Sequence, residues 1–125
     1  EDPNCGYCKR FARDLQNTDD VTIYTFLYPI LSADSEQKAK QIWCASDRTK
    51  AWLGWMIDGN TPTGDGKCNH PTDKIKALGV AHLFTVLELR VNGTPTVFFS
   101  NGERVGGAIP AAQVDKRLKQ IAEAK

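Results

Sequence analysis

The apolar positions at the start of the chain predict a helix followed by a strand. Cys8, Phe11 and Leu15 recur at the i, i+3, i+7 spacing of a single helix face, and the polar run at 18–20 ends the helix. In residues 21–28 both alternating faces are mostly apolar, which is typical of a strand covered by helices on both sides of a sheet. We therefore expect Cys8 to face the core.

The middle of the chain predicts two helical regions separated by a polar loop. Residues 32–35 contain side chains suited to a helix N-cap, and a long helical region over about 36–57 follows them. Gly54 is the position at which that region is expected to bend or divide. Residues 58–69 are rich in Gly, Thr, Asp and Pro and predict a loop, whereas residues 71–89 predict the second helical region.

The last third of the chain predicts a hairpin and a final helix. Residues 94–99 read as a strand, and Asn101-Gly102 is a signal for a two-residue hairpin turn that leads into a short strand at 103–105. Pro110 is suited to the start of a helix. That helix carries an apolar stripe at Val114, Leu118 and Ile121. The order helix, strand, helices, strand, strand, helix indicates an α/β domain.

The predicted order lacks one element. In an α/β domain a strand normally feeds the helix that follows it and anchors that helix in the sheet. Only residues 1–4 precede Cys5, too few to form such a strand. We therefore expect that an N-terminal strand is missing from this chain.

Composition and charge narrow the class of protein. The 125 residues are enough for one domain, and 41% hydrophobic with 25% charged residues is ordinary for a globular protein. A formal net charge of +1 gives no reason to expect a nucleic-acid partner. The apolar stretch at 21–31 is too short to span a bilayer as a helix.

The candidate chemistry lies in the Cys5-Gly6-Tyr7-Cys8 motif. Two cysteines three residues apart fit the first turn of a helix, where free N–H groups and the helix dipole favour a thiolate on Cys5. Asn4 is placed to cap this helix. Cys8, one turn further and on the apolar face, is expected to keep a higher pKa and to act as the resolving thiol.

The cysteines allow two other interpretations, a zinc site and a structural bridge. Half of a zinc site would need Cys44 and Cys68 as further ligands, but a second C-x-x-C or a His pair is lacking, with His70 a weak hint in its favour. A purely structural bridge within Cys5–Cys8 would close too short a loop to contribute much stability. We therefore favour a redox-active pair.

Cys44 and Cys68 bracket the polar loop. A bridge between them would stabilise the fold by about 3–4 kcal/mol in the chain-entropy model, and would require an oxidising compartment. We favour the bridge over the alternative of two free thiols, because free thiols beside an exchanging pair invite misreaction. Three tryptophans and one histidine are expected to be packed in the core, namely Trp43, Trp52, Trp55 and His82. The basic residues after the motif, Lys9 and Arg10, are expected to be solvated.

Five segments in order resemble the DsbC-type disulfide isomerases of the bacterial periplasm, within the thioredoxin superfamily. They are Asp-Pro-Asn-Cys-Gly-Tyr-Cys-Lys at 2–9, Ile-Trp-Cys-Ala at 42–45, Val-Asn-Gly-Thr-Pro-Thr at 91–96, Asn-Gly at 101–102 and Gly-Ala-Ile-Pro at 107–110. The resemblance covers essentially the whole chain. The Gly after the first cysteine is similar to the DsbC type rather than to the related DsbG type, which generally has Pro there.

The resemblance implies a thioredoxin fold, one catalytic domain over 1–125 with a helical insertion at about 35–89. It also implies that Thr94-Pro95 is a cis peptide opposite the Cys5–Cys8 pair, whereas the residues alone leave cis and trans open. Cys5 and Cys8 would be catalytic, and Gly6, Tyr7, Thr94 and Pro95 would contact the substrate. We expect the N-terminal dimerisation domain of the family to be missing from this chain.

The resemblance further implies a function in the periplasm. Cys5 would attack wrong disulfides of misfolded exported proteins, and a client thiol (isomerisation) or Cys8 (reduction) would resolve the mixed disulfide. A membrane reductase of the DsbD type would donate electrons, the full-length protein would be a homodimer, and no cofactor beyond the cysteines is expected. Two alternatives stay open: a DsbA-like net dithiol oxidase, whose motif usually carries Pro-His, and a client-holding chaperone module.

Overall fold

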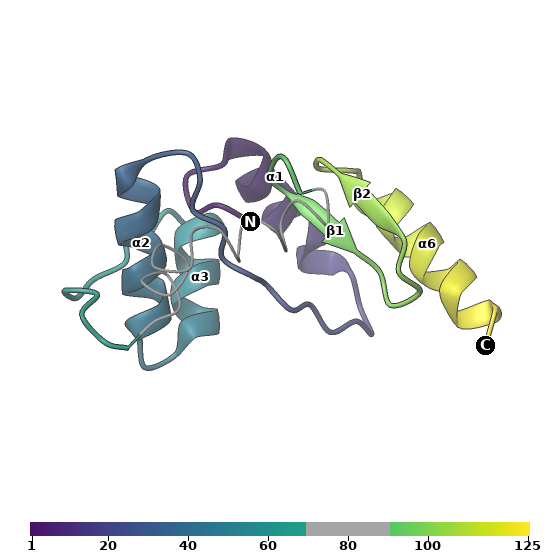
Figure 1. Ribbon diagram of the computed structural model, residues 1–125. Helices are drawn as coiled ribbons and strands as arrows, with labels where there is room; N and C mark the ends of the chain where they lie inside the picture. The colour runs from purple at the N-terminus through teal and green to yellow at the C-terminus, as the bar shows by residue number, and fades with distance from the viewer. Residues whose placement is uncertain (70–90) are drawn as a thin grey trace.

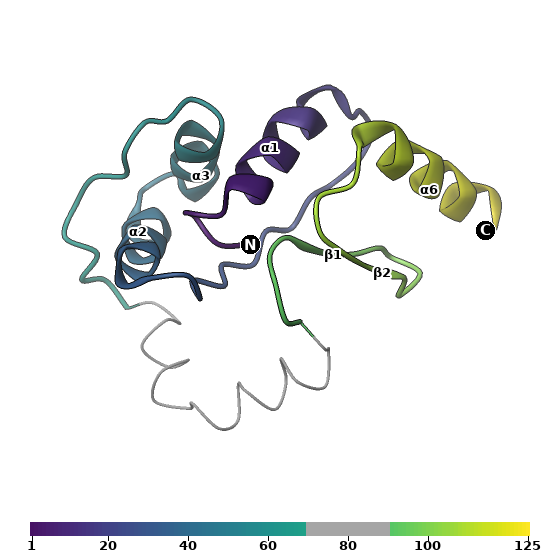
Figure 2. The ribbon, with the colours of Figure 1, turned by 90° about the horizontal axis from the view of Figure 1, so that it is seen from above.

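The computed structural model describes residues 1–69 and 91–125 (Figure 1). Its elements in chain order are α1 (Gly6–Asp14), the 3-10 helix η1 (Leu15–Asn17), α2 (Ala33–Cys44), α3 (Arg48–Met56), β1 (Thr96–Phe98), β2 (Arg104–Gly106) and α6 (Ala111–Glu123). Figures 1 and 2 show α2 beside α3 at one end, the β1–β2 hairpin with α6 at the other, and α1 between them. The helical region predicted at 71–89, including His82, lies outside the described residues.

Helix α1 forms as its apolar spacing predicts. Cys8 and Phe11 are buried, and Leu15 in η1 is half-buried and packs with Phe11. The polar residues after Asn17 end the helical stretch, as expected. One face of α1 thus contacts both halves of the core, because Cys8 packs with Ile42 and Met56 while Phe11 packs on the hairpin side.

The strand predicted at 21–28 is wrong for this structure: the segment is extended but is not part of a sheet. Among the described residues its backbone is bonded across the chain to Glu1, whose N-terminal ammonium donates to the Phe26 carbonyl at 2.8 Å and whose carbonyl accepts from the Tyr28 N–H at 2.7 Å. The Tyr28 carbonyl accepts locally from the Ile30 N–H at 3.0 Å. A strand requires a continuous partner, and among the described residues a single residue supplies it. Tyr24 and Phe26 are therefore 78% and 80% exposed.

The long helical region predicted at 36–57 is two helices, and the division is not at Gly54. The break falls at 45–47, where Ala45 has the extended ψ of 147° and Asp47 caps α3 by accepting from the Lys50 N–H at 3.0 Å. An aspartate N-cap stabilises a new helix start, so the capping preference of Asp47 outweighs the weak breaking tendency of a helical glycine. Ser32 caps α2 as predicted, accepting from the Ser35 N–H.

The predicted hairpin is present with a longer loop than expected. β1 and β2 pair antiparallel, with Val97 opposite Val105 in a two-stranded sheet. The Phe99 N–H donates to the Glu103 carbonyl, and the Gly102 N–H returns to the Phe99 carbonyl, each at 2.9 Å. Gly102 has φ +86°, so the connection is a three-residue loop that ends in a left-handed glycine rather than a two-residue turn.

Helix α6 begins after Pro110, as predicted, and covers the hairpin. Val114 is buried, and Leu118 and Ile121 pack with Phe99 and Val97. A second cluster, built from Cys5, Cys8, Ile42, Trp52 and Met56, lies between α1, α2 and α3. In the described part of the chain no helix is long and apolar enough to cross a membrane.

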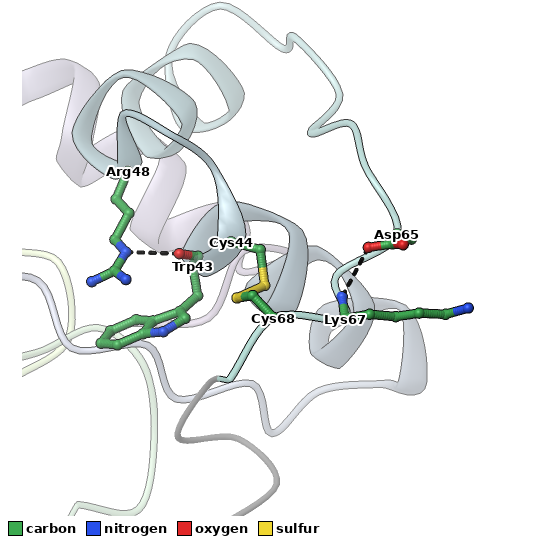
Figure 3. Close-up of a disulfide and its surroundings, with 6 residues drawn as sticks. All are labelled: Trp43, Cys44, Arg48, Asp65, Lys67 and Cys68. Atoms are coloured by element: carbon green, nitrogen blue, oxygen red, sulfur yellow. Dashed lines mark hydrogen bonds between the residues drawn. A yellow bond between two sulfur atoms is a disulfide. The ribbon is translucent and has the colours of Figure 1, made fainter.

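A disulfide joins Cys44 at the end of α2 to Cys68 in the polar loop, the pairing that the sequence predicts (Figure 3). Next to it, Arg48 donates from Nε to the Trp43 carbonyl at 2.7 Å and its guanidinium lies 4.0 Å from the centre of the Trp43 ring. The loop also packs closely on α2: a Cβ at Gly66 would approach the Lys40 Cβ to 2.9 Å. The bridge therefore holds a loop that has few apolar side chains of its own.

We expect the double variant Cys44→Ala/Cys68→Ala to lose about 3 kcal/mol of free energy of unfolding, because the open loop regains conformational entropy in the unfolded state. Urea denaturation followed by circular dichroism measures the loss. Placing the variant in a Cys5→Ser/Cys8→Ser background excludes disulfide reshuffling. A change below about 0.5 kcal/mol, the range of an ordinary surface substitution, would contradict a structural role for this bridge.

Candidate active site

Cys5 is itself the N-cap of α1. Its sulfur accepts from the Cys8 N–H at 3.0 Å, and its own N–H donates to the Asp2 carbonyl at 3.1 Å. The predicted cap at Asn4 is wrong, because the Asn4 side chain donates instead to Asp34 at 2.7 Å. A sulfur in the cap position faces the free N–H groups of the first turn, a setting that stabilises negative charge on it.

Cys8 lies one turn inward and is fully buried. Burial raises the pKa of the Cys8 thiol to about 12, with the hydrogen bond to Cys5 acting in the same direction. The Asp2 backbone N–H and the Thr94 side chain act against this rise and lower the pKa of Cys8. Cys8 is therefore a protonated thiol at neutral pH. Cys5 is also buried, but 4% of its surface is exposed against none for Cys8.

The Thr94-Pro95 peptide lies beside the cysteines and is cis, as the family resemblance implies. The Cys5 thiol donates to the Thr94 carbonyl at 3.4 Å, a contact between residues 89 positions apart. The segment is held from its other side, because the Gly107 N–H donates to the Pro95 carbonyl at 2.8 Å. Pro95 is buried. Folding thus brings the two distant motifs into one site.

Asp2 anchors the segment before Cys5, and the sequence analysis did not identify it. Its side chain is completely buried and accepts three hydrogen bonds: from the Asn4 N–H at 2.8 Å, the Ser35 hydroxyl at 2.7 Å and the Leu31 N–H at 2.9 Å. Buried carboxylates need such partners. The only signal in the sequence was an Asp-Pro-Asn run, which resembles ordinary turn chemistry.

Trp55 approaches the same segment from α3. Its indole N–H donates to the Pro3 carbonyl, and its ring lies under two ammonium groups, Lys9 at 4.1 Å and Lys38 at 4.9 Å from the centre. Such cation–π contacts contribute about 0.5–1 kcal/mol at exposed sites. Trp55 is half-buried and Trp52 is buried, in line with the core role expected for the tryptophans.

Tyr7, between the cysteines, projects from the first turn. It is 65% exposed, and the Arg10 guanidinium lies 5.6 Å from its ring centre. Gly6 beside it is also exposed. The described residues contain no group of three or more His, Cys, Asp or Glu side chains arranged to hold a metal ion. Because Cys44 and Cys68 are bonded to each other, they are not zinc ligands together with Cys5 and Cys8.

Comparisons with known proteins agree on one family. Residues 1–122 match the family model of a thioredoxin-like domain. The chain is 49% identical over 118 residues to the probable thiol:disulfide interchange protein DsbC of Bordetella pertussis, covering 94% of this chain and 39% of that protein. The DsbC protein of Escherichia coli K12 is 31% identical over 123 residues, with 95% and 48% covered.

A solved structure shares both sequence and fold with the chain. The crystal structure of a disulfide interchange protein from Neisseria gonorrhoeae superimposes with a TM-score of 0.80 at 36% identity, covering 96% of this chain and 82% of that one. The chain thus spans about two fifths of the Bordetella protein's length and about half of the Escherichia coli protein's.

The raised pKa of Cys8 predicts that the dithiol form loses stability in alkali. Above pH 9 an unfolded Cys8 releases its proton while the folded one, with a pKa of about 12, keeps it. The free energy of unfolding then falls with pH across this window, by at most about 1.4 kcal/mol per pH unit for one proton. Urea denaturation between pH 8 and 11 measures the slope, and Cys8→Ala should remove that part of it. An equal slope in the variant would contradict a buried protonated Cys8.

Proposed function

The chain belongs to the thioredoxin-like domain family, and from that premise we propose that it catalyses thiol–disulfide exchange on misfolded exported proteins. The observation that carries the proposal is the first turn of α1: the sulfur of Cys5 caps the helix, Cys8 lies directly behind it, and Thr94 contacts Cys5 from the opposite side. Disulfide interchange is also the activity for which relatives that match nearly the whole chain are named.

In the proposed reaction the Cys5 thiolate attacks one sulfur of a client disulfide. A Cys5–client mixed disulfide forms, and the other client sulfur leaves as a thiolate. In isomerisation a second client thiolate attacks the mixed disulfide, releases Cys5 and leaves the client with a new disulfide. In reduction the Cys8 thiolate attacks the Cys5 sulfur, and the second client sulfur leaves as a thiolate that takes up a proton. The client disulfide is thereby reduced to a dithiol, and the Cys5–Cys8 dithiol is oxidised to a disulfide by the same two electrons.

The proposed roles follow from protonation and exposure. Cys5 is the attacking sulfur because it is the more exposed of the two cysteines and occupies the helix N-cap. Cys8 is the resolving thiol, and its high pKa keeps it from closing the mixed disulfide at once. A slow resolving step lengthens the life of the mixed disulfide, which gives a second client thiol time to react. This favours isomerisation over a DsbA-like net oxidation.

Substrate contact is proposed for the residues that surround Cys5. Gly6 and Tyr7 are exposed in the first turn of α1, where they present one glycine and one aromatic ring to a client. Thr94 and Pro95 form the wall opposite, next to the edge of β1, where an extended client backbone would add by hydrogen bonding. The aromatic ring of Tyr7 provides apolar contact without sequence preference, which suits an enzyme for many clients.

The partners and the compartment are part of the same proposal. The Cys44–Cys68 bridge fits an oxidising compartment, the periplasm. To act again as a reductase there, the Cys5–Cys8 disulfide needs an electron donor, for which we propose a membrane reductase of the DsbD type. In the full-length protein, a separate dimerisation domain would pair two catalytic domains like this one.

The test is disulfide exchange by the reduced chain. We expect it to reactivate ribonuclease with scrambled disulfides, Cys5→Ser to abolish that activity, and Cys8→Ser to accumulate mixed disulfides with the client that are visible on non-reducing gels. The measured potential of Cys5–Cys8 against glutathione, with net reduction or net oxidation of the client, separates isomerase from oxidase.

The matched control is Cys44→Ala/Cys68→Ala, which also removes two cysteines but leaves the proposed pair intact. Its activity per folded molecule should stay within about twofold of the wild type, because the bridge acts on the loop and not on the reacting sulfurs. Undiminished reactivation by Cys5→Ser would refute the proposal. Suppression of client aggregation without any exchange would point to the client-holding chaperone instead.

A further inference from the structure

We propose that Asp2 and Trp55 are positioning residues that together set the rate at which Cys8 resolves the mixed disulfide on Cys5. This inference rests on the proposed exchange function and adds to it. The Asp2 side chain ties the segment 2–4 to the start of α2, and the Trp55 side chain ties the same segment to α3. Neither side chain is a cysteine or belongs to the proposed substrate surface.

The Asp2 carboxylate ties three parts of the chain to one point. Through Ser35 it reaches the first turn of α2, through Leu31 the end of the extended segment, and through Asn4 its own loop. All three partners donate, so an amide in its place would turn an N–H group toward at least one donor. Asp2→Asn therefore keeps the shape of the side chain but loosens the anchor.

Trp55 restrains the neighbouring peptide. Its indole N–H donates to the carbonyl of Pro3, the residue between Asp2 and Asn4, and Lys9 from α1 stacks on the same ring. Pro3 is itself buried, so water does not readily replace this donor. Trp55→Phe keeps an aromatic ring for the lysines and removes the hydrogen bond to Pro3.

The anchored segment connects directly to both sulfurs. The Asp2 carbonyl accepts from the Cys5 N–H at 3.1 Å, which fixes the residue that carries the mixed disulfide. The Asp2 backbone N–H acts on Cys8, where it lowers the pKa against the effect of burial. A displacement of Asp2 therefore changes the geometry at Cys5 and removes a source of stabilisation for the Cys8 thiolate.

Resolution is the step most sensitive to this displacement. Cys8 first loses its proton, which is balanced by the proton that the departing client thiolate takes up, and the Cys8 thiolate then attacks the Cys5 sulfur. The Cys5–Cys8 bond forms, and the bond from Cys5 to the client breaks with the client sulfur leaving as thiolate. Attack requires alignment of three sulfurs, and displacements of about 1 Å can cost on the order of a hundredfold in rate. The first attack by Cys5 on a flexible external disulfide does not require that internal alignment.

The experiment follows the two steps separately. Reduced protein is mixed with oxidised glutathione, quenched in acid at set times, and the dithiol, the glutathione mixed disulfide and the internal disulfide are quantified by mass spectrometry. We expect Asp2→Asn and Trp55→Phe each to slow resolution by about tenfold or more, as loss of one well-placed interaction does, while mixed-disulfide formation stays within about twofold.

Matched controls keep the test specific. Asp47→Asn makes the same carboxylate-to-amide change at the exposed N-cap of α3, where the side chain accepts from the Lys50 N–H and does not contact the segment 2–4. Trp43→Phe makes the same ring change on α2, where the ring packs on Arg48 beside the Cys44–Cys68 bridge and not on the segment 2–4. Both controls should resolve at the wild-type rate, even where the free energy of unfolding, measured in urea, falls as much as in the test variants.

The outcomes separate this inference from the proposed function. Equal resolution rates in wild type and in both test variants would overturn the positioning role and leave exchange intact. Faster resolution in Asp2→Asn would also overturn it, since it would show that the negative charge of Asp2 acts through space on the sulfurs. Failure of even Cys8→Ser to form a mixed disulfide would refute the proposed function itself.

Discussion

The buried carboxylate of Asp2 is the interaction on which the arrangement of the site depends. Its three donors come from its own loop, from the end of the extended segment and from α2. A buried carboxylate is tolerated only when it is hydrogen-bonded, and these three donors meet that requirement. The same residue then uses its main chain to orient Cys5. One side chain thus links the start of the chain, the helical pair α2–α3 and the first turn of α1.

The parts of the fold that could be predicted from sequence are those with local causes. The Cys8, Phe11 and Leu15 spacing specifies the buried face of α1, Ser32 caps α2, and Pro110 precedes α6. The pair Cys44–Cys68 follows from cysteine spacing around a polar loop. The cis isomer of the Thr94-Pro95 peptide could be predicted only from the family resemblance, because the local sequence suits either isomer.

The remainder depends on contacts between distant residues, which periodicity does not encode. The apolar residues at 21–28 predict a strand, but strand formation depends on a partner, and in the described part of the chain Glu1 is the residue that bonds to this segment from a distance. Asp47 divides the helical region because of a single capping contact. Asp2 and Trp55 belong to the site through bonds that cross 33 and 52 positions respectively. Their chemistry is visible in the sequence, but their proximity is not.

The placement of the aromatic residues has an optical consequence. All three tryptophans, Trp43, Trp52 and Trp55, lie in α2 and α3, whereas all three tyrosines lie between residues 7 and 28. Indole emission therefore monitors the helical pair, and phenol absorption monitors α1 and the extended segment. Within one unlabelled molecule, the two chromophores give separate spectroscopic records of the halves that meet at Cys5. Trp55 is hydrogen-bonded to the Pro3 carbonyl and lies under two ammonium groups, so its emission is the most sensitive of the three to changes at that junction.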